Sequence, residues 1–253
     1  MFWLIVCKSP REIELMRKAG KVLFEALQLA KEIAKVGVTT ECINEKLEEY
    51  LLRNNCRPIF KGYKGFPKSI CTSINDEIVH GIPGKTSLRE GDILSIDIGA
   101  EYKKYMADTA TTFPIGKITK KAQRLLDVCE ESLHIAIKTV KADIKLSEVC
   151  RAIQNYVEGE GYSVVRDYTG HGIGRQMHED PQIPNFVPES LLNNDVTLTA
   201  GMTIAIEPMI CEGTFETEVL DNNWTVRTKD HSLSAHFEHT MVVTENGADI
   251  LTV

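Results

Sequence analysis

Two segments of the chain repeat one pattern of alternating apolar residues that ends in a carboxylate. Gly91 to Asp97 reads GDILSID and Gly201 to Glu207 reads GMTIAIE, so each acid lies six residues after a glycine. Such alternation is typical of a half-buried strand. The two acids are 110 residues apart, whereas the helices expected to begin at Thr40 and Ser147 are 107 apart. Because these intervals differ, the pattern indicates a diverged tandem duplication with insertions rather than a regular repeat array.

Each half of the chain contains two helical segments followed by strand-like segments. Ser9-Pro10 is typical of a helix start, and the helical spacing of apolar residues then continues towards Gly37. In the second half the same periodicity extends from Lys120 to about Val140. This order predicts an α+β fold with an approximate twofold axis and antiparallel strands. Since no low-complexity linker is present, we expect a single catalytic domain, 1–253, with halves of about 9–115 and 118–253.

Composition excludes several classes of protein. Hydrophobic residues make up 43% of the 253 positions and charged residues 26%, which is ordinary for a globular chain and excludes disorder. The net charge of −7 argues against nucleic acid as the main ligand. Seven scattered cysteines without a CxxC motif indicate a reducing compartment. The apolar segment Met1–Cys7 is too short for a membrane-spanning helix, and we expect it to form a strand.

Two aspartates are expected to face each other on a hairpin. The strand patterns around Asp97 and Asp108 are separated by a short polar connection. A two-residue tip at Tyr102-Lys103 would place these carboxylates opposite each other on one face, with their β-carbons about 4.5–5.5 Å apart. Tyr-Lys is a poor tight turn, so the tip could be longer, and an exposed hairpin is the alternative. Buried carboxylates at this distance would have to share a proton or bind cations.

Two glutamates and a histidine extend this group. Glu207 ends an apolar strand before Pro208, and Glu238 precedes the apolar segment that follows it. His171 lies between glycines, which leave its imidazole uncrowded. Taken singly, each acid could be a solvent-facing strand residue and the histidine a structural one. Taken together, two acids from each half would converge on the approximate twofold axis.

Four carboxylates with one or two imidazoles, and without thiolates, indicate a particular metal chemistry. Hard oxygen ligands with a single nitrogen suit Mn²⁺, Fe²⁺ or Co²⁺ better than structural zinc. Carboxylates can bridge, so five ligands suffice for two ions about 3.5–4 Å apart. Such a pair generates hydroxide and stabilises a tetrahedral intermediate, so the residues alone predict a binuclear metallohydrolase.

These residues, in this order and with these neighbours, resemble the ligand set of type I methionine aminopeptidases. The resemblance covers essentially the whole chain and implies the pseudo-twofold "pita-bread" fold, an antiparallel sheet covered by two pairs of helices. It implies that Asp97 binds one metal, that Asp108 and Glu238 bridge two, and that His171 and Glu207 complete the shells. The motifs that carry it are Asp97, Asp108-Thr-Ala-Thr-Thr-Phe113, Gly170-His-Gly-Ile-Gly174, Glu207-Pro208 and Glu238-His-Thr240.

The resemblance also implies catalytic and substrate-binding residues. Glu207 would be the general base towards a bridging water, and His80 and His178 would contact the scissile amide and the developing oxyanion. The methionine pocket would comprise Tyr63, Phe66, Cys71, Met177 and Trp224, together with His80 and His178, although some of these could be ordinary packing residues. Two departures from the family bear on pocket shape and rate. Met177 replaces the usual aromatic residue before His178, and His236 replaces the usual glutamine two residues before Glu238.

The activity implied by the resemblance is hydrolytic removal of initiator methionine from peptides with a small second residue. The cofactors would be two divalent ions, with Co, Mn, Fe(II), Zn and Ni as the candidates. The implied partners are peptides and nascent polypeptides with N-terminal methionine, near the ribosome, without specific nucleic acid or a membrane. We expect an enzyme of the short bacterial type, because neither an N-terminal zinc region nor the type II insertion is apparent. We expect a cytoplasmic monomer by default, since no exposed oligomer signature is visible. A non-catalytic binding protein on this fold and a broader aminopeptidase are the alternatives.

Overall fold

The computed structural model describes residues 5–253. Five α-helices and one short 3₁₀ helix lie within these residues. The α-helices are α1 (Pro10–Ile33), α2 (Thr40–Arg53), α3 (Lys120–Thr139), α4 (Leu146–Gly159) and α5 (Glu189–Asn193), and the 3₁₀ helix is Tyr63–Gly65. No helix among residues 5–253 combines the length and the apolar character that crossing a membrane would require.

The strands form one large sheet and two small ones, and every strand pair is antiparallel. The large sheet has nine strands in the order β1-β4-β5-β14-β9-β7-β8, with β2 added beside β4 and β15 beside β14. Its strands are β1 (Arg57–Pro58), β2 (Ile70–Ile74), β4 (Ile93–Tyr102), β5 (Tyr105–Pro114), β7 (Gly170–Gly172), β8 (Glu179–Ile183), β9 (Thr203–Ile206), β14 (Glu238–Thr244) and β15 (Gly247–Ile250). The small sheets are β13 (Ser234–His236), β10 (Met209–Cys211) and β6 (Ser163–Val164), and β11 (Thr217–Val219), β12 (Val226–Thr228) and β3 (Glu77–Val79).

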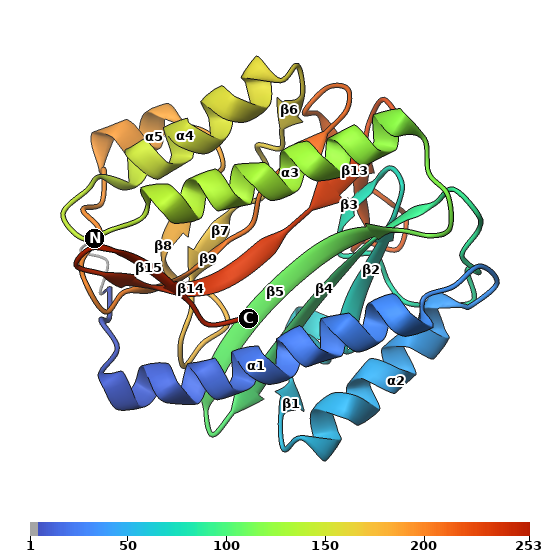
Figure 1. Ribbon diagram of the computed structural model, residues 1–253, viewed down its shortest axis with the longest axis horizontal. Coiled ribbons are helices and arrows are strands. Elements are labelled where there is room, and N and C mark those ends of the chain that lie inside the picture. Colours follow the sequence, from blue (N-terminus) through green and yellow to red (C-terminus); the bar gives the residue numbers. More distant parts are fainter. Residues whose placement is uncertain (1–4) are drawn as a thin grey trace.

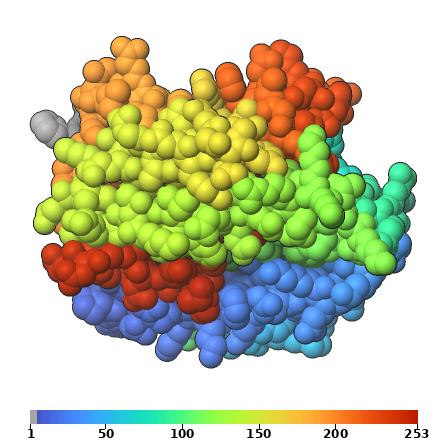
Figure 2. All heavy atoms as spheres, turned by 45° about the horizontal axis from the view of Figure 1, so that its top comes forward, coloured from blue at the N-terminus to red at the C-terminus, as the bar shows by residue number. Residues whose placement is uncertain are grey.

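The two long helix pairs cover the same face of the large sheet. In Figure 1, α1 and α2 lie over one half of the sheet and α3 and α4 over the other, with the β5–β14 junction between them. Figure 2 shows the two pairs packed side by side, with the C-terminal segment (red) between them at one end. The opposite face of the sheet is free of these four helices and is available for a site.

The core explains why the acidic residues face away from the helices. Leu94, Ile96 and Ile98 of β4 pack with α1 and α2 in one buried apolar cluster. Because side chains alternate along a strand, Asp97 points to the other face. In the second half, Ile204 and Ile206 of β9 pack with α3 and α4 in the same way. Burial of the apolar side of each strand therefore determines where its acid points.

The β4–β5 hairpin has a different register from the expected one. Tyr102 pairs with Tyr105 around a two-residue tip, Lys103-Lys104. Both tip residues have positive φ, 50° and 70°, as a tight turn that matches strand twist requires. The expected tip at Tyr102-Lys103 was wrong by one position, and Asp97 therefore pairs with Ala110 instead of Asp108. A shift of two in the pairing keeps the faces unchanged, so both aspartates still share one side of the sheet.

The starts of two helices also differ from the sequence expectation. Thr39, not Thr40, caps α2 by accepting a hydrogen bond from the backbone N–H of Cys42 at 3.2 Å. Ser147 lies inside the first turn of α4, where its hydroxyl donates to Asp195 at 2.6 Å. Of the strand expected over residues 1–7, residues 1–4 lie outside the described part of the chain, and residues 5–7 have no regular structure.

Candidate metal centre

Three acidic residues lie on the helix-free face of strands β4, β5 and β14. They are Asp97, Asp108 and Glu238. Ala110 of β5 pairs with Asp97 of β4 on one side and with Glu238 of β14 on the other. Asp108 lies two residues before Ala110 and therefore on the same face. Because the residue between Asp97 and Glu238 has only a methyl side chain, space remains between their carboxylates.

The second half contributes His171 and Glu207 from neighbouring positions. His171 of β7 pairs with Ala205 of β9, which pairs in turn with Thr240 of β14. Glu207 follows the last residue of β9, and its Oε1 lies 3.6 Å from His171 Nε2. Ligand atoms of Asp108, His171 and Glu238 all lie within 4.8 Å of one another, close enough to hold one metal ion.

The imidazole of His171 is oriented for coordination. Its Nδ1 lies 2.9 Å from the carbonyl oxygen of Gly172, which accepts the Nδ1–H hydrogen bond. The lone pair then resides on Nε2, the nitrogen that faces Glu207. Burial lowers the pKa of His171 to about 3, so the ring is neutral at physiological pH. A neutral imidazole with a free Nε2 is the form that binds metals.

Asp108 and Glu238 are buried, and their clustering with the partly buried Asp97 and Glu207 is electrostatically costly without a cation. Burial, together with the charges of Asp108 and Glu207, raises the pKa of Asp97 well above its usual range, and burial raises the pKa of Asp108 to about 7. The pKa values of Glu207 and Glu238 are raised in the same way, mainly by burial and by Asp108. Asp97 Oδ1 and Glu238 Oε1 are buried without a hydrogen-bond partner. Oxygen-rich ligands with unused lone pairs fit a hard divalent cation, so the residues present suit the metal that their chemistry implies.

Threonine hydroxyls hold the backbone beneath these acids. Thr240 Oγ1 accepts from the N–H of Asp108 at 2.9 Å and donates to its carbonyl oxygen at 2.7 Å. Thr109 Oγ1 donates to the carbonyl oxygen of Glu238 at 2.7 Å. These bonds cross the junction between β5 and β14, which has only two ladder pairs there. The acids are thus carried on a rigid part of the sheet, as pre-organised ligation requires.

Two histidines flank the acids. His178 stacks obliquely on His171 with ring centroids 4.3 Å apart, and its Nδ1 lies 2.8 Å from the hydroxyl of Tyr63. His80 has a positive φ of 58°, an uncommon conformation for a residue other than glycine. The next residue, Gly81, lies so close to the Thr72 carbonyl that an added β-carbon would sit 2.0 Å from its oxygen. Burial lowers the pKa of His80 to about 4, so it too is neutral at physiological pH.

An apolar cavity of about 230 Å³ opens onto the acids. Phe66 and Trp224 meet edge to face with centroids 5.1 Å apart, and Met177 is buried in the same cluster. All twelve residues that the sequence predicted for the site line this cavity: Tyr63, Phe66, Cys71, His80, Asp97, Asp108, His171, Met177, His178, Glu207, Trp224 and Glu238.

Three residues near the site were not among those predicted. Phe60 and Lys64 line the cavity, and the apolar run Pro58-Ile59-Phe60 before the glycine-rich loop was a signal that could have indicated the first. His236 was noted only as a family departure, but its buried Nε2 lies 3.8 Å from Glu207 Oε2 and has no hydrogen-bond partner. No local sequence signal indicates that contact, because β13 reaches the site through long-range pairing with β10.

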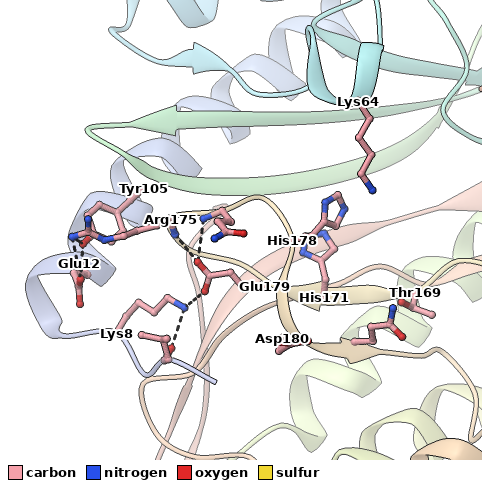
Figure 3. A pocket seen from close by; sticks show the side chains of 13 residues that line it. Lys8, Glu12, Lys64, Tyr105, Thr169, His171, Arg175, His178, Glu179 and Asp180 are labelled. Carbon is pink, nitrogen blue, oxygen red and sulfur yellow. Dashed lines mark hydrogen bonds and ion pairs between the residues drawn. The ribbon is translucent and has the colours of Figure 1, made fainter. Parts of the chain in front are cut away.

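A wider cleft of about 620 Å³ adjoins the cavity and shares His171, His178 and Lys64 with it. Figure 3 shows Lys64 pointing towards the two histidines from the opposite side, with Lys8, Glu179 and Arg175 on the far wall. The arrangement is a deep end lined by acids and histidines that is connected to a polar, open approach.

Comparison with known proteins identifies the family. Residues 14–245 match the model of metallopeptidase family M24. The chain is 46% identical to methionine aminopeptidase 1 of Bacillus subtilis over 98% of this chain and 99% of that protein. It is 44% identical to the methionine aminopeptidase of Clostridium perfringens over 99% of each. The crystal structure of methionine aminopeptidase from Thermotoga maritima superposes with a TM-score of 0.95 at 44% identity, covering 98% of this chain and 99% of that one.

The expected pita-bread fold is confirmed by this structural likeness and by the antiparallel sheet with its covering helices. The carboxylate and imidazole cluster agrees with a family named for metal-dependent peptide hydrolysis. The chain belongs to metallopeptidase family M24.

Proposed function

We propose that this protein is a methionine aminopeptidase that removes N-terminal methionine from peptides with a small second residue. The observation that carries the proposal is the apolar cavity that ends at the four clustered acids. A peptide bond at the mouth of that cavity would have its first side chain among Phe66, Met177 and Trp224 and its carbonyl near the acids. The similarity to proteins named methionine aminopeptidase over nearly the whole chain supports the same activity.

Five residues are proposed to hold two divalent ions: Asp97, Asp108, His171, Glu207 and Glu238. Divalent ions of this kind lower the pKa of a water molecule and polarise a peptide carbonyl. The proposal names a class of ions, Mn, Fe(II), Co, Zn and Ni, because each of them accepts carboxylate and imidazole ligands. The unpartnered oxygens of Asp97 and Glu238 support the assignment.

Glu207 is proposed as the general base. Its carboxylate has the Nε2 atoms of His171 and His236 at 3.6 and 3.8 Å, one near each oxygen. In this proposal the carboxylate accepts a proton from the attacking water and later returns that proton to the leaving amine. Its strongly raised pKa in the ion-free protein reflects burial and the nearby Asp108 charge, which bound cations would offset.

His80 and His178 are proposed to contact the reacting amide. Each is neutral at physiological pH because burial lowers its pKa, so each retains one N–H that can donate. The Tyr63 hydroxyl holds the Nδ1 side of His178, which leaves Nε2 to face the substrate. Donors fixed before the substrate arrives stabilise the charge that develops on the carbonyl oxygen.

The methionine side chain is proposed to lie among Tyr63, Phe66, Cys71, Met177 and Trp224. Thioether sulfur packs favourably near aromatic edges, and an unbranched chain fits a narrow cavity better than a β-branched one. In this proposal Met177 replaces an aromatic wall with a flexible one, so the cavity adapts more readily to its occupant.

The organisation of the chain is part of the same proposal. We propose a single catalytic domain with halves of about 9–115 and 118–253. The sheet order supports it, because the β4-β5 pair of the first half and the β14-β9 pair of the second half join in one sheet at the β5–β14 junction. All seven cysteines are free, which supports a reducing, cytoplasmic location. A monomer that acts on nascent polypeptides near the ribosome is testable by light scattering and by co-sedimentation with ribosomes.

The test is hydrolysis of three peptides by the protein after removal of metals and resupply of Mn²⁺, Fe²⁺ or Co²⁺. We expect Met-Ala-Ser to be cleaved with kcat/KM at least about 10-fold above Leu-Ala-Ser, the discrimination that a hydrophobic pocket provides. Met-Pro reports tolerance at the second residue. Glu207→Gln is the matched control and should reduce kcat by at least about 100-fold. An absence of turnover with all three ions, or equal cleavage of the Leu peptide, would overturn the proposal.

A further inference from the structure

The segment Gly174–Glu179 carries two residues of the proposed site, Met177 and His178. It connects β7 to β8 and contains no ladder hydrogen bonds of its own before Glu179. Glu179 Oε1 instead accepts from the backbone N–H groups of Arg175 at 2.7 Å and Gln176 at 3.1 Å (Figure 3). One carboxylate oxygen therefore helps to close the turn that presents His178. Two backbone hydrogen bonds also hold this turn, from Gly174 N–H to the Gln176 carbonyl oxygen at 3.1 Å and from Met106 N–H to the Gly174 carbonyl oxygen at 2.8 Å.

The other oxygen of Glu179 is bound by a lysine from the far end of the chain. Lys8 Nζ donates to Glu179 Oε2 at 2.5 Å and to the Val6 carbonyl oxygen at 3.0 Å. The two side chains are only 5% and 18% exposed, so this ion pair is largely removed from water. The backbone N–H of Lys8 is fixed in addition, because it donates to the carbonyl oxygen of Gly201 at 2.7 Å. Loss of one partner of such a pair is costly, since it leaves the other charge uncompensated.

Packing around the pair leaves little freedom. A β-carbon added at Gly174 would lie 2.4 Å from Lys8 Cε and 2.7 Å from Glu179 Oε1. The aliphatic part of Lys8 thus rests directly on the first residue of the segment. Any shift of the lysine would be transmitted to the turn.

The first turn of α1 also reaches this segment, through the hydroxyl of Tyr105 in β5. Arg175 Nη2 donates to the Tyr105 hydroxyl at 2.6 Å, and that hydroxyl donates to Glu12 Oε1 at 2.5 Å. The Arg175 guanidinium also lies over the Tyr105 ring, 4.9 Å from its centroid. Because the Arg175 side chain is 65% exposed, these contacts contribute less than the buried pair. Residues 8 and 12, four positions apart, nevertheless hold the segment from two sides.

We infer that Lys8 and Glu179 are positioning residues that hold His178 in place through the Gly174–Glu179 turn. The inference rests on the proposed function, because His178 is assigned there to the reacting amide. The pair touches no reacting atom; it fixes the angle and depth at which the His178 imidazole faces the substrate. Misplacement of a catalytic group by about 1 Å can lower a rate by up to about 100-fold.

The test combines kinetics with hydrogen exchange of the full-length protein. In Lys8→Met, we expect kcat for Met-Ala-Ser to fall by about 10-fold or more while KM and the Mn²⁺ dissociation constant change by less than about 3-fold. Amides of the 174–179 segment should exchange at least about 10-fold faster, while those of α3 and α4 stay as in the parent protein. Glu179→Gln retains an amide oxygen for the two backbone donors but loses the charge, and should show a smaller effect of the same kind.

The matched control is Arg17→Met. Arg17 also lies in the N-terminal part of the chain and pairs with Asp249 at 2.7 Å, but these two side chains are 35% and 52% exposed. The hydrogen bonds of Arg17 go to Glu14, Ile250 and Asp249 rather than to the turn. Arg17→Met should leave kcat and exchange in the 174–179 segment unchanged. The double variant Lys8→Met/Glu179→Gln should be less impaired than the two single effects combined, because the partners act on each other.

The outcomes of these measurements decide the inference. Parent-like kcat and exchange in Lys8→Met, or equal effects from Arg17→Met, would overturn it. If Lys8→Met fails to fold, Glu179→Gln decides by the same two measurements. If the parent protein itself does not cleave Met-Ala-Ser, the proposed function fails, but faster exchange confined to the 174–179 segment would still support the role of the pair in holding the turn.

Discussion

Asp97 and Asp108 face the same side of one hairpin but are not paired with each other. Asp97 lies opposite Ala110, and Asp108 lies opposite Gly99. Ala110 pairs with Asp97 on one neighbouring strand and with Glu238 on the other. The offset therefore places Asp97, Asp108 and Glu238 around the methyl group of Ala110. A diagonal arrangement separates the β-carbons of the two aspartates more than direct pairing would, while their carboxyl groups still approach closely enough to interact with each other.

Replacement of Asp108 by asparagine should abolish metal-dependent hydrolysis without unfolding the protein. The change keeps the shape and the backbone contacts with Thr240 but removes one of four clustered charges. We expect activity below about 1% of the parent protein and an unchanged or higher melting temperature without metal, because like-charge repulsion is reduced. Full activity in Asp108→Asn would contradict the proposal that Asp108 is a metal ligand.

Replacement of Ala110 by leucine should block the metal site. The larger side chain would occupy the space between Asp97 and Glu238 and cost about 1–3 kcal/mol through overpacking. Calorimetry should show Mn²⁺ affinity reduced by at least about 10-fold. Ala110→Gly keeps the space open and serves as the control, with near-normal affinity. Normal binding by the leucine variant would show that the site does not use this space.

Metal binding should raise thermal stability measurably. An ion at 100 times its dissociation constant stabilises a folded chain by about 2.7 kcal/mol, which is roughly 5–10 °C in melting temperature for a protein of this size. Differential scanning calorimetry with and without Mn²⁺ checks this, and excess chelator should reverse the shift. The same titration of Asp108→Asn should give a much smaller shift, so an equal shift in both proteins would contradict binding at these acids.

Phe66→Ala should weaken the recognition of methionine. Phe66 is 4% exposed and forms the edge-to-face contact with Trp224. Loss of its ring should lower kcat/KM for Met-Ala-Ser by roughly 10- to 100-fold, the range set by about 1.5–3 kcal/mol of lost apolar contact. Phe24→Ala, at an exposed position on α1, is the matched control and should leave kcat/KM unchanged. A small loss at Phe66 and a large one at Phe24 would refute the pocket assignment.

His80 should make stability depend on pH. Burial lowers its pKa from 6.5 to about 4 in the folded protein. A group whose pKa is lowered by folding contributes stability above its unfolded pKa and loses that contribution as pH falls towards the folded value. Unfolding free energy should therefore decrease between about pH 6.5 and 4, by at most about 3 kcal/mol from this residue. His80→Asn, which tolerates positive φ, should flatten the urea-unfolding profile over this window; an unchanged slope would contradict the role of His80.

Local signals in the sequence predicted the elements well but their ends less well. Apolar spacing gave the four long helices because one helical face must be buried, and that spacing repeats every few residues. The caps were less certain, since two adjacent threonines, Thr39 and Thr40, could each start α2. Ser147 resembles a cap but instead binds Asp195, a residue 48 positions away. The hairpin tip was missed because Lys103-Lys104 lacks the Gly or Asn that usually marks a turn with positive φ.

The sequence by itself determined which residues could ligate a metal and which face of each strand they would occupy. Alternation along a strand sets Asp97, Asp108 and Glu207 opposite the apolar residues that must be buried, whatever the neighbouring strands are. Tertiary structure alone decided how these segments meet. It placed Ala110 between Asp97 and Glu238 in the sheet. It also brought His236 to Glu207, and Lys8 to Glu179 across 171 residues. Such contacts arise from packing between distant segments, and no local periodicity encodes them.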